Sequence, residues 1–332
     1  MSDFPLGWAP IRIYPRDDGL WVDWCYLGEE RFREPFFDAT IDICLRSPFN
    51  QLFRPRTPIA RLCALPPGAG AVPPTGFIFH MSRCGSTLVS QMLARLSQNI
   101  VISEASPIDA VVRSNEARPE VSDEQRVLWL RGLMSHLGQR RSGERNFFVK
   151  FDCWHVLELP LLRRAFPAVP WIFLYRDPVE VLVSQMKMRG AQMVPGIVTP
   201  ALFKIDPVAA VQMPAVEYCA RVLAAICDAA LQNFSGGGGL LVNYRDLPQA
   251  LTAAILPHFG VESAGADLAA MADAAAFDAK TPSLPFAPDA AAKIRAADDA
   301  VRAAAETWIA PLYAELEALR ARSTTDAAMA KV

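Results

Sequence analysis

From Gly76 onward, short apolar runs alternate with longer stretches whose apolar residues recur at helical spacing. Apolar runs of four or five residues between turn signals are typical of buried strands, whereas apolar residues at i, i+3, i+4 and i+7 indicate helices. The predicted strands are Phe77–His80, Ile100–Ser103, Phe147–Phe151, Ile172–Tyr175 and Gly239–Asn243. Helical segments lie between them, notably Glu124–Leu137 and Val216–Phe234. This alternation predicts an α/β fold with a parallel sheet flanked by helices.

Residues 1–65 follow a different pattern, rich in Trp, Phe and Arg. Ile11–Tyr14 and Leu20–Tyr26 flank a turn-forming stretch and predict a hairpin. We therefore expect a small N-terminal β-rich region over 1–65, a Pro/Gly linker over 66–75, the main domain over 76–322 and a flexible tail over 323–332. The Ala-rich stretch Asp289–Arg320 predicts one or two further helices.

Composition and charge narrow the class of protein. Of the 332 residues, 52% are hydrophobic and 20% are charged, as in ordinary globular proteins. The net charge of −2 gives no basic field, so we expect neither nucleic acid nor a membrane surface as a partner. The N-terminus lacks a signal-peptide pattern and no apolar run is long enough to span a bilayer, so we expect a cytoplasmic protein. The seven cysteines form no CxxC pair, which indicates reduced thiols and no zinc site.

A short polar turn joins the first strand of the main domain to a predicted helix. The first turn of a helix has unpaired N–H groups and a positive dipole end, which favour a bound anion. A glycine lets the backbone approach such an anion, while hydroxyl groups and a cation add hydrogen bonds and charge. The turn predicts a phosphate-binding loop and reads Ser82-Arg83-Cys84-Gly85-Ser86-Thr87. It is not a Walker A loop, because no lysine separates Gly85 from Ser86.

A second candidate motif follows the strand Ile172–Tyr175. Asp177 and Pro178 are explained by helix initiation, as an N-cap and a proline at the first helical position. Arg176 and Ser184 are not explained in this way. The loop resembles the [KR]-x-G-[ST]-T motif of sulfotransferases that use 3′-phosphoadenosine 5′-phosphosulfate (PAPS). The spacing R-D-P-x-x-x-x-x-S resembles the 3′-phosphate signature of the same enzymes. The resemblance covers about residues 76–250.

The resemblance to this superfamily implies a donor and a reaction. The loop Ser82–Thr87 is expected to hold the 5′-phosphosulfate of PAPS, and Arg176 and Ser184 are expected to hold its 3′-phosphate. Adenosine 3′,5′-bisphosphate is then the product, and the acceptor is a hydroxyl or amine on an unidentified small molecule or glycan. We expect no metal requirement, since a monoanionic sulfonate does not demand the magnesium ion that a triphosphate does.

Catalytic candidates come from the ends of two further strands. Lys150 ends a strand on which sulfotransferases often place a lysine, in signatures such as KTH. Glu104 is the first candidate for the general base, because glycan and tyrosylprotein sulfotransferases use a glutamate in a similar region. His155 is the second candidate, and Asp152 stands where cytosolic sulfotransferases have their catalytic histidine. The sequence leaves these three alternatives for the base open.

Three other stretches carry weaker expectations. Residues 186–206, with three methionines, are predicted to form a loop over an apolar acceptor pocket. The four glycines at 236–239 are predicted to be a flexible connection, and the following stretch with Tyr244 and Asp246 is given a structural role.

Two other functions remain open: a P-loop kinase, with Asp152 or Asp177 mimicking a Walker B acid, and a nucleotide-binding protein without activity.

Overall fold

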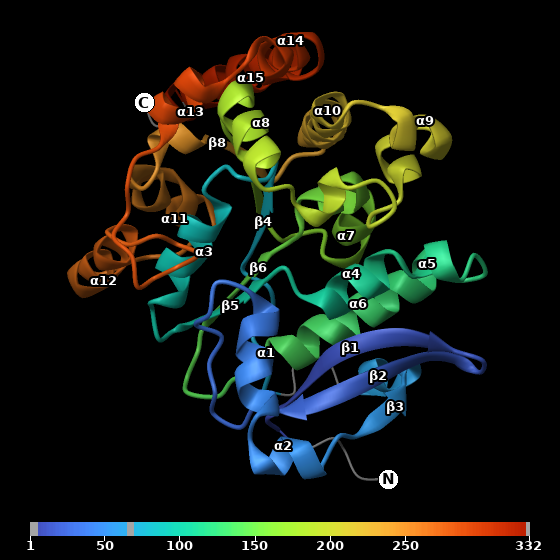
Figure 1. The fold of residues 1–332 in the computed structure, drawn as a ribbon. Helices are drawn as coiled ribbons and strands as arrows, with labels where there is room; N and C mark the ends of the chain where they lie inside the picture. The colour runs from blue at the N-terminus through green and yellow to red at the C-terminus, as the bar shows by residue number, and fades with distance from the viewer. Residues whose placement is uncertain (1–5, 65–69, 330–332) are drawn as a thin grey trace.

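The computed structural model describes residues 6–64 and 70–329, and its centre is a five-stranded parallel sheet. The sheet contains all five predicted strands, each within one residue of its predicted ends, in the order β5-β6-β4-β7-β8 (Figure 1). The strands are β4 (Gly76–His80), β5 (Asn99–Ser103), β6 (Asn146–Lys150), β7 (Trp171–Tyr175) and β8 (Gly239–Asn243). Every residue of β4, β5 and β7 is buried, which is why these strands appear as continuous apolar runs in the sequence.

The central strand β4 pairs with β6 on one side and with β7 on the other. The chain leaves β4 towards β5 and β6 first, and only then crosses to β7 and β8. Such a reversal of direction leaves a crevice at the carboxyl ends of the strands, where ligands of open α/β sheets bind.

Helices cover both faces of this sheet (Figure 1). One side carries α3 (Ser86–Ala94), α11 (Leu256–His258) and α12 (Gly265–Ala275), and the other carries α4 (Ser106–Val112), α6 (Asp123–Leu137), α7 (Leu159–Ala165) and α10 (Ala215–Phe234). Helices α6 and α10 confirm the two predicted by name, and α6 begins with a capping box between Ser122 and Gln125. Helix α8 (Pro178–Lys187) follows β7 and begins at the predicted N-cap Asp177.

The C-terminal part of the chain is helical, as predicted from its Ala-rich composition. It comprises α13 (Ala290–Ala296), α14 (Asp299–Ala304), the π-helical stretch η7 (Ala305–Ile309) and α15 (Ala310–Met329). Helix α15 therefore includes residues 323–329 of the predicted tail. Shorter helices are α5 (Ser114–Ala117), α9 (Pro207–Gln212) and the 3₁₀ turns η2 (Cys153–Glu158), η3 (Ala191–Met193), η4 (Pro200–Phe203) and η5 (Tyr244–Asp246). The π-helical turn η6 (Leu251–Ile255) precedes α11.

The N-terminal region contains the predicted hairpin within a three-stranded antiparallel sheet, β1-β2-β3. Its elements are β1 (Trp8–Arg16), β2 (Gly19–Tyr26), α1 (Phe37–Leu45), α2 (Pro48–Leu52), β3 (Arg56–Pro58) and the 3₁₀ turn η1 (Ile59–Ala64). The helices α1 and α2 were not predicted. Trp24 packs edge-on against His136 of α6, with ring centroids 4.7 Å apart, so this region shares one hydrophobic core with the main domain.

The predicted linker lies partly outside the described residues, since 65–69 are not described. Beyond them, the Val72 N–H donates to the carbonyl of Gly138 and the Thr75 N–H donates to that of Phe147, which ties this stretch to the main domain. Within the described ranges, no helix is both long and apolar enough to cross a membrane.

Candidate active site

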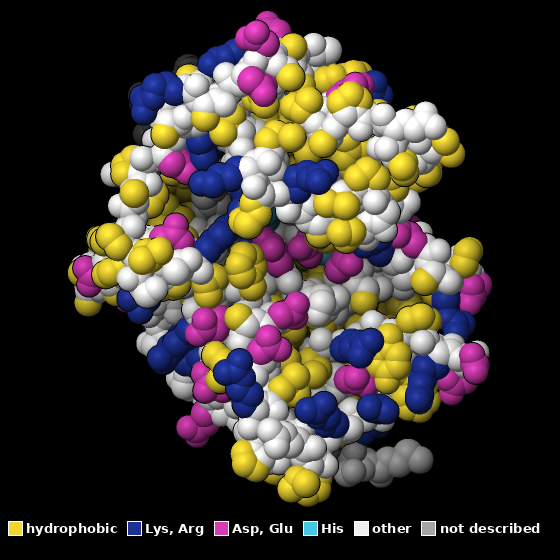
Figure 2. All heavy atoms as spheres, in the orientation of Figure 1, with side chains coloured by type: hydrophobic (Ala, Val, Ile, Leu, Met, Phe, Trp, Pro, Cys, Tyr) yellow, Lys and Arg dark blue, Asp and Glu magenta, His cyan; other side chains and the backbone are white. Residues whose placement is uncertain are grey.

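A cavity of about 400 Å³ lies at the carboxyl ends of the parallel strands. This volume falls within the usual range for small-molecule sites, about 300–1,000 Å³. The loops after β4, β5, β6 and β7 line it, together with residues 277–289 from the C-terminal part of the chain. Figure 2 shows a hollow near the middle of the molecule, with Lys and Arg side chains above it and Asp and Glu side chains below it.

The predicted phosphate-binding loop lines this cavity with all six of its residues. Its backbone turns sharply, because Ser82, Arg83 and Gly85 all have positive φ, at 79°, 52° and 83°. Gly85 is the N-cap of α3, and within the described part of the chain no side chain caps that helix start. The N-terminus of α3 therefore faces the cavity with the positive end of its dipole.

Two neighbouring side chains hold the start of the loop. The Ser82 N–H donates to Nδ1 of His80, at 3.1 Å, and the Ser82 hydroxyl accepts a hydrogen bond from Nε2 of Gln185, at 2.9 Å. His80 ends β4 and is buried, and burial lowers its pKa, so its imidazole is neutral and Nδ1 can accept. No sequence motif marks His80, although it ends the strand that leads into the loop.

Gly85 cannot carry a side chain without displacing its neighbours. A Cβ atom there would lie 2.8 Å from Cδ2 of Tyr244 and 2.8 Å from Cδ1 of Leu247. Its φ of +83° also lies in the left-handed region that glycine adopts without strain. The glycine predicted from the motif is thus required by both packing and backbone conformation.

The loop cysteine is a buried packing residue. Cys84 donates its S–H to the carbonyl oxygen of Leu174, with Sγ and the oxygen 3.1 Å apart. Burial raises the pKa of this thiol to about 12, so it stays protonated at neutral pH. All seven cysteines are unpaired, in line with the prediction of free thiols.

Arg176 and Ser184 line the same cavity as the loop. The Arg176 guanidinium lies over the ring of Tyr244, 3.9 Å from its centroid, and forms ion pairs with Glu180 and with Asp289. The Nη2–Oδ1 distance to Asp289 is 2.8 Å. The stretch that contains Tyr244 was predicted to be structural only. This prediction is incomplete, because Tyr244 forms part of the cavity wall and supports Arg176.

Glu104 forms a tight ion pair with Lys150 at the ends of β5 and β6. The Lys150 Nζ lies 2.5 Å from Oε1 of Glu104, and Nε2 of His80 lies 3.4 Å from the same oxygen. Burial alone would raise the pKa of Glu104. The Lys150 ammonium and the hydrogen bond from His80 outweigh burial and hold this pKa well below its usual range. Glu104 lines the cavity, whereas the Lys150 side chain is wholly buried, with its Nζ 5.0 Å from the ring centroid of Phe36.

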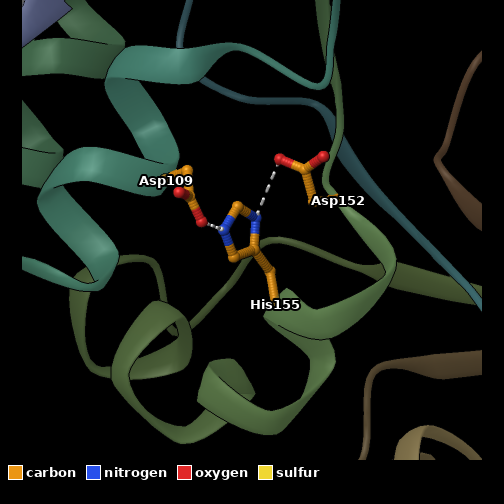
Figure 3. Close-up of side chains that lie close together, drawn as sticks. All are labelled: Asp109, Asp152 and His155. Atoms are coloured by element: carbon orange, nitrogen blue, oxygen red, sulfur yellow. Dashed lines mark hydrogen bonds and ion pairs between the residues drawn. The ribbon is translucent and has the colours of Figure 1, made fainter. Parts of the chain in front are cut away.

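Three further side chains, Asp152, His155 and Asp109, lie in a row, with the imidazole between the two carboxylates (Figure 3). Asp152 lines the cavity, whereas His155 is buried and does not. The imidazole lies between the two carboxylates, with Nε2 2.8 Å from Oδ1 of Asp109 and Nδ1 3.8 Å from Oδ2 of Asp152. Burial raises the pKa of Asp152 to about 7, and the negative charges of Glu104 and Asp109 add to this effect.

These three residues are the candidate metal ligands among the described residues. One atom from each lies within 4.8 Å of the others. However, different ring nitrogens of His155 face the two carboxylates (Figure 3), so the three side chains do not converge on one point. The geometry favours a row of interacting side chains, with one hydrogen bond between His155 and Asp109, over an ion site.

Distant segments contribute cavity residues that were not predicted from the sequence. Lys280, Asp289 and Lys293 come from the C-terminal part of the chain, and Phe36 comes from the N-terminal region. No local motif marks them, because they reach the cavity only through tertiary packing. The cavity lining carries four cations and four acids: Arg83, Arg176, Lys280 and Lys293 against Glu104, Asp152, Asp278 and Asp289. The predicted loop over the pocket contributes Gly190, Ala191 and Gln192.

Comparison with known proteins identifies the family. A model of the sulfotransferase family matches residues 74–264, which is more than half of the chain. The chain therefore belongs to the sulfotransferase family. No curated protein sequence matches the chain.

Several experimentally determined structures resemble the fold at low sequence identity. A sulfotransferase from Mycobacterium avium is 12% identical over 64% of this chain and 69% of that chain, with a TM-score of 0.40. The sulfotransferase domain from the curacin biosynthetic pathway is 18% identical over 76% of this chain and 98% of that one, with a TM-score of 0.42. A sulfotransferase from Alicyclobacillus acidocaldarius is 16% identical over 75% and 96%, with a TM-score of 0.44.

Proposed function

We propose that this protein transfers a sulfonate group from PAPS to a hydroxyl or amine acceptor on a small molecule or glycan. One observation carries the proposal: the loop Ser82–Thr87 and the pair Arg176 and Ser184 line a single cavity. In the sequence these two motifs lie about 90 residues apart. Their meeting at one cavity is what a ligand with two separate phosphate positions requires.

The residues of the cavity suit the two ends of this donor. The N-terminus of α3, with Arg83 and the hydroxyls of Ser86 and Thr87, offers hydrogen bonds and positive charge to the 5′-phosphosulfate. Arg176 and Ser184 offer a second anion site for the 3′-phosphate. Arg176 is already held by Tyr244 and Glu180, so its guanidinium is oriented before a ligand arrives.

When bound, PAPS supplies an activated sulfonate group. The chain must then stabilise the charge that gathers on the leaving phosphate and accept a proton from the acceptor. Positioned cations and N–H donors perform the first task, by analogy with phosphoryl transfer. For the second, Glu104 and Asp152 are two carboxylates that line the cavity beside the loop. Lys150 keeps Glu104 ionised and fixed in place.

Aromatic side chains form part of the cavity wall. Phe36, Trp154, Phe277 and Phe286 line the cavity together with the loop and the acids. Aromatic surfaces suit the apolar part of an acceptor or the flat face of a sugar ring. A kinase reaction is not favoured, because the loop lacks the Walker A lysine.

Isothermal titration calorimetry tests the donor site directly. We expect adenosine 3′,5′-bisphosphate to bind more tightly than adenosine 5′-monophosphate, and ATP with Mg²⁺ to bind weakly. Arg176→Ala should weaken the bisphosphate by roughly 1.5–3 kcal/mol, the usual worth of a hydrogen bond to a charged group, and the monophosphate much less. Arg16→Ala, at an exposed position of the N-terminal hairpin, is the matched control.

Two outcomes would contradict this proposal. Equal losses for both nucleotides in Arg176→Ala would show that Arg176 does not read the 3′-phosphate. Absence of bisphosphate binding to the wild-type protein would remove PAPS as the donor. Transfer from labelled PAPS to components of a cell extract then identifies an acceptor.

A further inference from the structure

We propose that Asp152 takes the proton from the acceptor, and that His155 and Asp109 form a relay that stabilises this proton. The inference rests on the function proposed above and assigns its general base. It departs from the first expectation from the sequence, Glu104, and from the second, direct action of His155. Three structural observations support it.

The first observation concerns which side chain the acceptor can reach from the cavity. Asp152 lines the cavity that the phosphate-binding loop also lines, whereas His155 is buried behind it. A base must come within hydrogen-bond reach of the proton that it removes. Asp152 meets that condition from the cavity wall, and His155 can act only through Asp152.

The second observation concerns the environments of the two cavity carboxylates. Glu104 lies 2.5 Å from the Lys150 ammonium, which makes it a weak base. For Asp152, His155 is the basic side chain within 4.0 Å among the described residues, with Nδ1 3.8 Å from Oδ2. Glu104, Asp109, Lys150 and His155 are the charged or titratable groups that act on it. Burial and the two acids raise the pKa of Asp152 to about 7, close to the value at which a general base works best at neutral pH.

The third observation is the tautomer of His155. Asp109 also accepts a hydrogen bond from Nε1 of Trp154, at 2.7 Å, and pairs with Arg113 at 3.3 Å, so it is an ionised acceptor. Nε2 of His155 must therefore donate to Asp109, with 2.8 Å between the atoms. In the neutral ring this leaves a lone pair on Nδ1. That nitrogen is buried, has no hydrogen-bond partner in the described part of the chain, and faces Asp152.

In the proposed reaction the acceptor exchanges its O–H bond for an O–S bond. As the acceptor oxygen forms its bond to sulfur, its O–H bond breaks and the proton moves to a carboxylate oxygen of Asp152. The bond between sulfur and the bridging oxygen of the donor breaks, and its electron pair leaves with adenosine 3′,5′-bisphosphate. Once the 3.8 Å between Oδ2 of Asp152 and Nδ1 of His155 shortens to a hydrogen bond, the proton can pass to Nδ1, which gives an imidazolium that Asp109 stabilises. It returns to solvent after the product leaves.

A comparison of two acceptors of different acidity tests the role of Asp152. The probes are phenol, with a pKa of about 10 like that of tyrosine, and the much more acidic 4-nitrophenol, in transfer from labelled PAPS. Asp152→Asn should lower the rate with phenol by about 10²–10⁴-fold, the usual contribution of a general base. The loss with 4-nitrophenol should be much smaller, because this acceptor is largely ionised at slightly alkaline pH. Asp299→Asn, at an exposed position of α14, is the control.

The pH dependence separates the relay from a merely structural role of His155. In the wild-type protein the rate should rise with pH through about 7, as Asp152 ionises. When the relay holds the proton on His155, the imidazolium charge stabilises the Asp152 carboxylate and lowers the pKa of Asp152, so His155→Gln should move this rise to higher pH. A lower rate with an unmoved pH midpoint would overturn the relay, and equal losses for both phenols in Asp152→Asn would overturn the assignment of the base.

Nuclear magnetic resonance of the imidazole nitrogens tests the relay without any acceptor. The chain has four histidines, so the spectrum can be assigned by substitution. At high pH we expect the proton of His155 on Nε2, and its signals should shift as Asp152 titrates in the wild-type protein but not in Asp152→Asn. A proton on Nδ1, or identical titrations in both proteins, would overturn the relay. This result does not depend on PAPS binding, so its failure is distinct from failure of the proposed function.

Discussion

Replacing Lys150 by methionine removes the cation of the buried pair with Glu104 and leaves most of the side-chain volume. The Lys150 side chain is wholly buried and that of Glu104 is 25% exposed. After the substitution, the contact with His80, at 3.4 Å, is the ion-pair contact that the Glu104 carboxylate retains among the described residues. The variant must therefore either keep an unpaired, largely buried carboxylate or protonate it.

Both routes destabilise the folded protein by a similar amount. Removing one partner of a buried ion pair costs about 3–5 kcal/mol. Protonating a glutamate at pH 7, from an ordinary pKa of about 4.3, costs roughly 1.4 kcal/mol for each unit, or about 3.7 kcal/mol. Because Glu104 is partly exposed, we expect the lower end of this range, about 3 kcal/mol at pH 7.

The effect of Lys150→Met should depend on pH. In the wild-type protein the ion pair lowers the pKa of Glu104, so its stabilisation is present above the unfolded pKa and is lost as pH falls. The difference in unfolding free energy between the wild-type protein and Lys150→Met should therefore be largest at pH 7 and shrink below about pH 4.5. Glu104→Gln combined with Lys150→Met should recover part of the loss at pH 7, because no unpaired charge remains.

Urea unfolding at several pH values measures these differences, and the melting temperature should fall by about 6 °C at pH 7, at roughly 2 °C per kcal/mol for a chain of this size. Lys204→Met, at an exposed position, is the control and should change stability by less than about 0.5 kcal/mol. A loss below about 1 kcal/mol at pH 7 would refute the reasoning, since that is the value of a surface pair. An equal loss of stability at pH 7 and below about pH 4.5 would also refute the reasoning.

Two further predictions concern the loop and a distant ion cluster. Gly85→Ala places a Cβ 2.8 Å from the Tyr244 ring at a positive φ, so calorimetry should show binding of adenosine 3′,5′-bisphosphate weakened at least about tenfold, with an unchanged circular dichroism spectrum. Unchanged affinity would remove the loop from the site. Burial tends to raise the pKa of Glu317, but hydrogen bonds from Arg320 and Tyr175 outweigh it and lower this pKa to about 2. This stabilisation is present above the unfolded pKa and is lost as pH falls towards 2, so Glu317→Gln should show a flatter stability curve between about pH 5 and 2. Parallel curves would show that the cluster contributes nothing.

The parallel sheet was predictable because its signals are local. Each strand has five residues, most or all of them buried, and turn or capping residues such as Asp177 and Pro178 mark where helices begin. Helix α1 was missed although Phe37, Ile41 and Cys44, which become its buried face, have helical spacing. The dense aromatic and arginine content around it favoured a β-rich interpretation. Helix α1 instead packs its buried face into the tertiary core.

The candidate site was predictable only where a motif lies within one strand-turn-helix unit. The loop at Gly85 and the spacing from Arg176 to Ser184 are of this kind. The sequence does not predict which polar side chain faces the cavity. Asp152 and His155 are three residues apart, and of these two only Asp152 lines it. Lys280 reaches the cavity from a segment almost 200 residues after the loop. Such placements depend on how distant segments pack, and no local pattern encodes them.

The strand order β5-β6-β4-β7-β8 has a consequence for how this protein could acquire new substrates. Glu104 and Asp152 follow strands on one side of β4, whereas Arg176, Ser184 and Tyr244 follow strands on the other. Under the proposed function, the two acids near the acceptor belong to one contiguous block of sequence that contains β5 and β6, whereas the donor-binding residues lie on both sides of that block. Under the proposed function, exchanging the block that contains β5 and β6 between family members would change the acceptor and leave the affinity for the nucleotide unchanged.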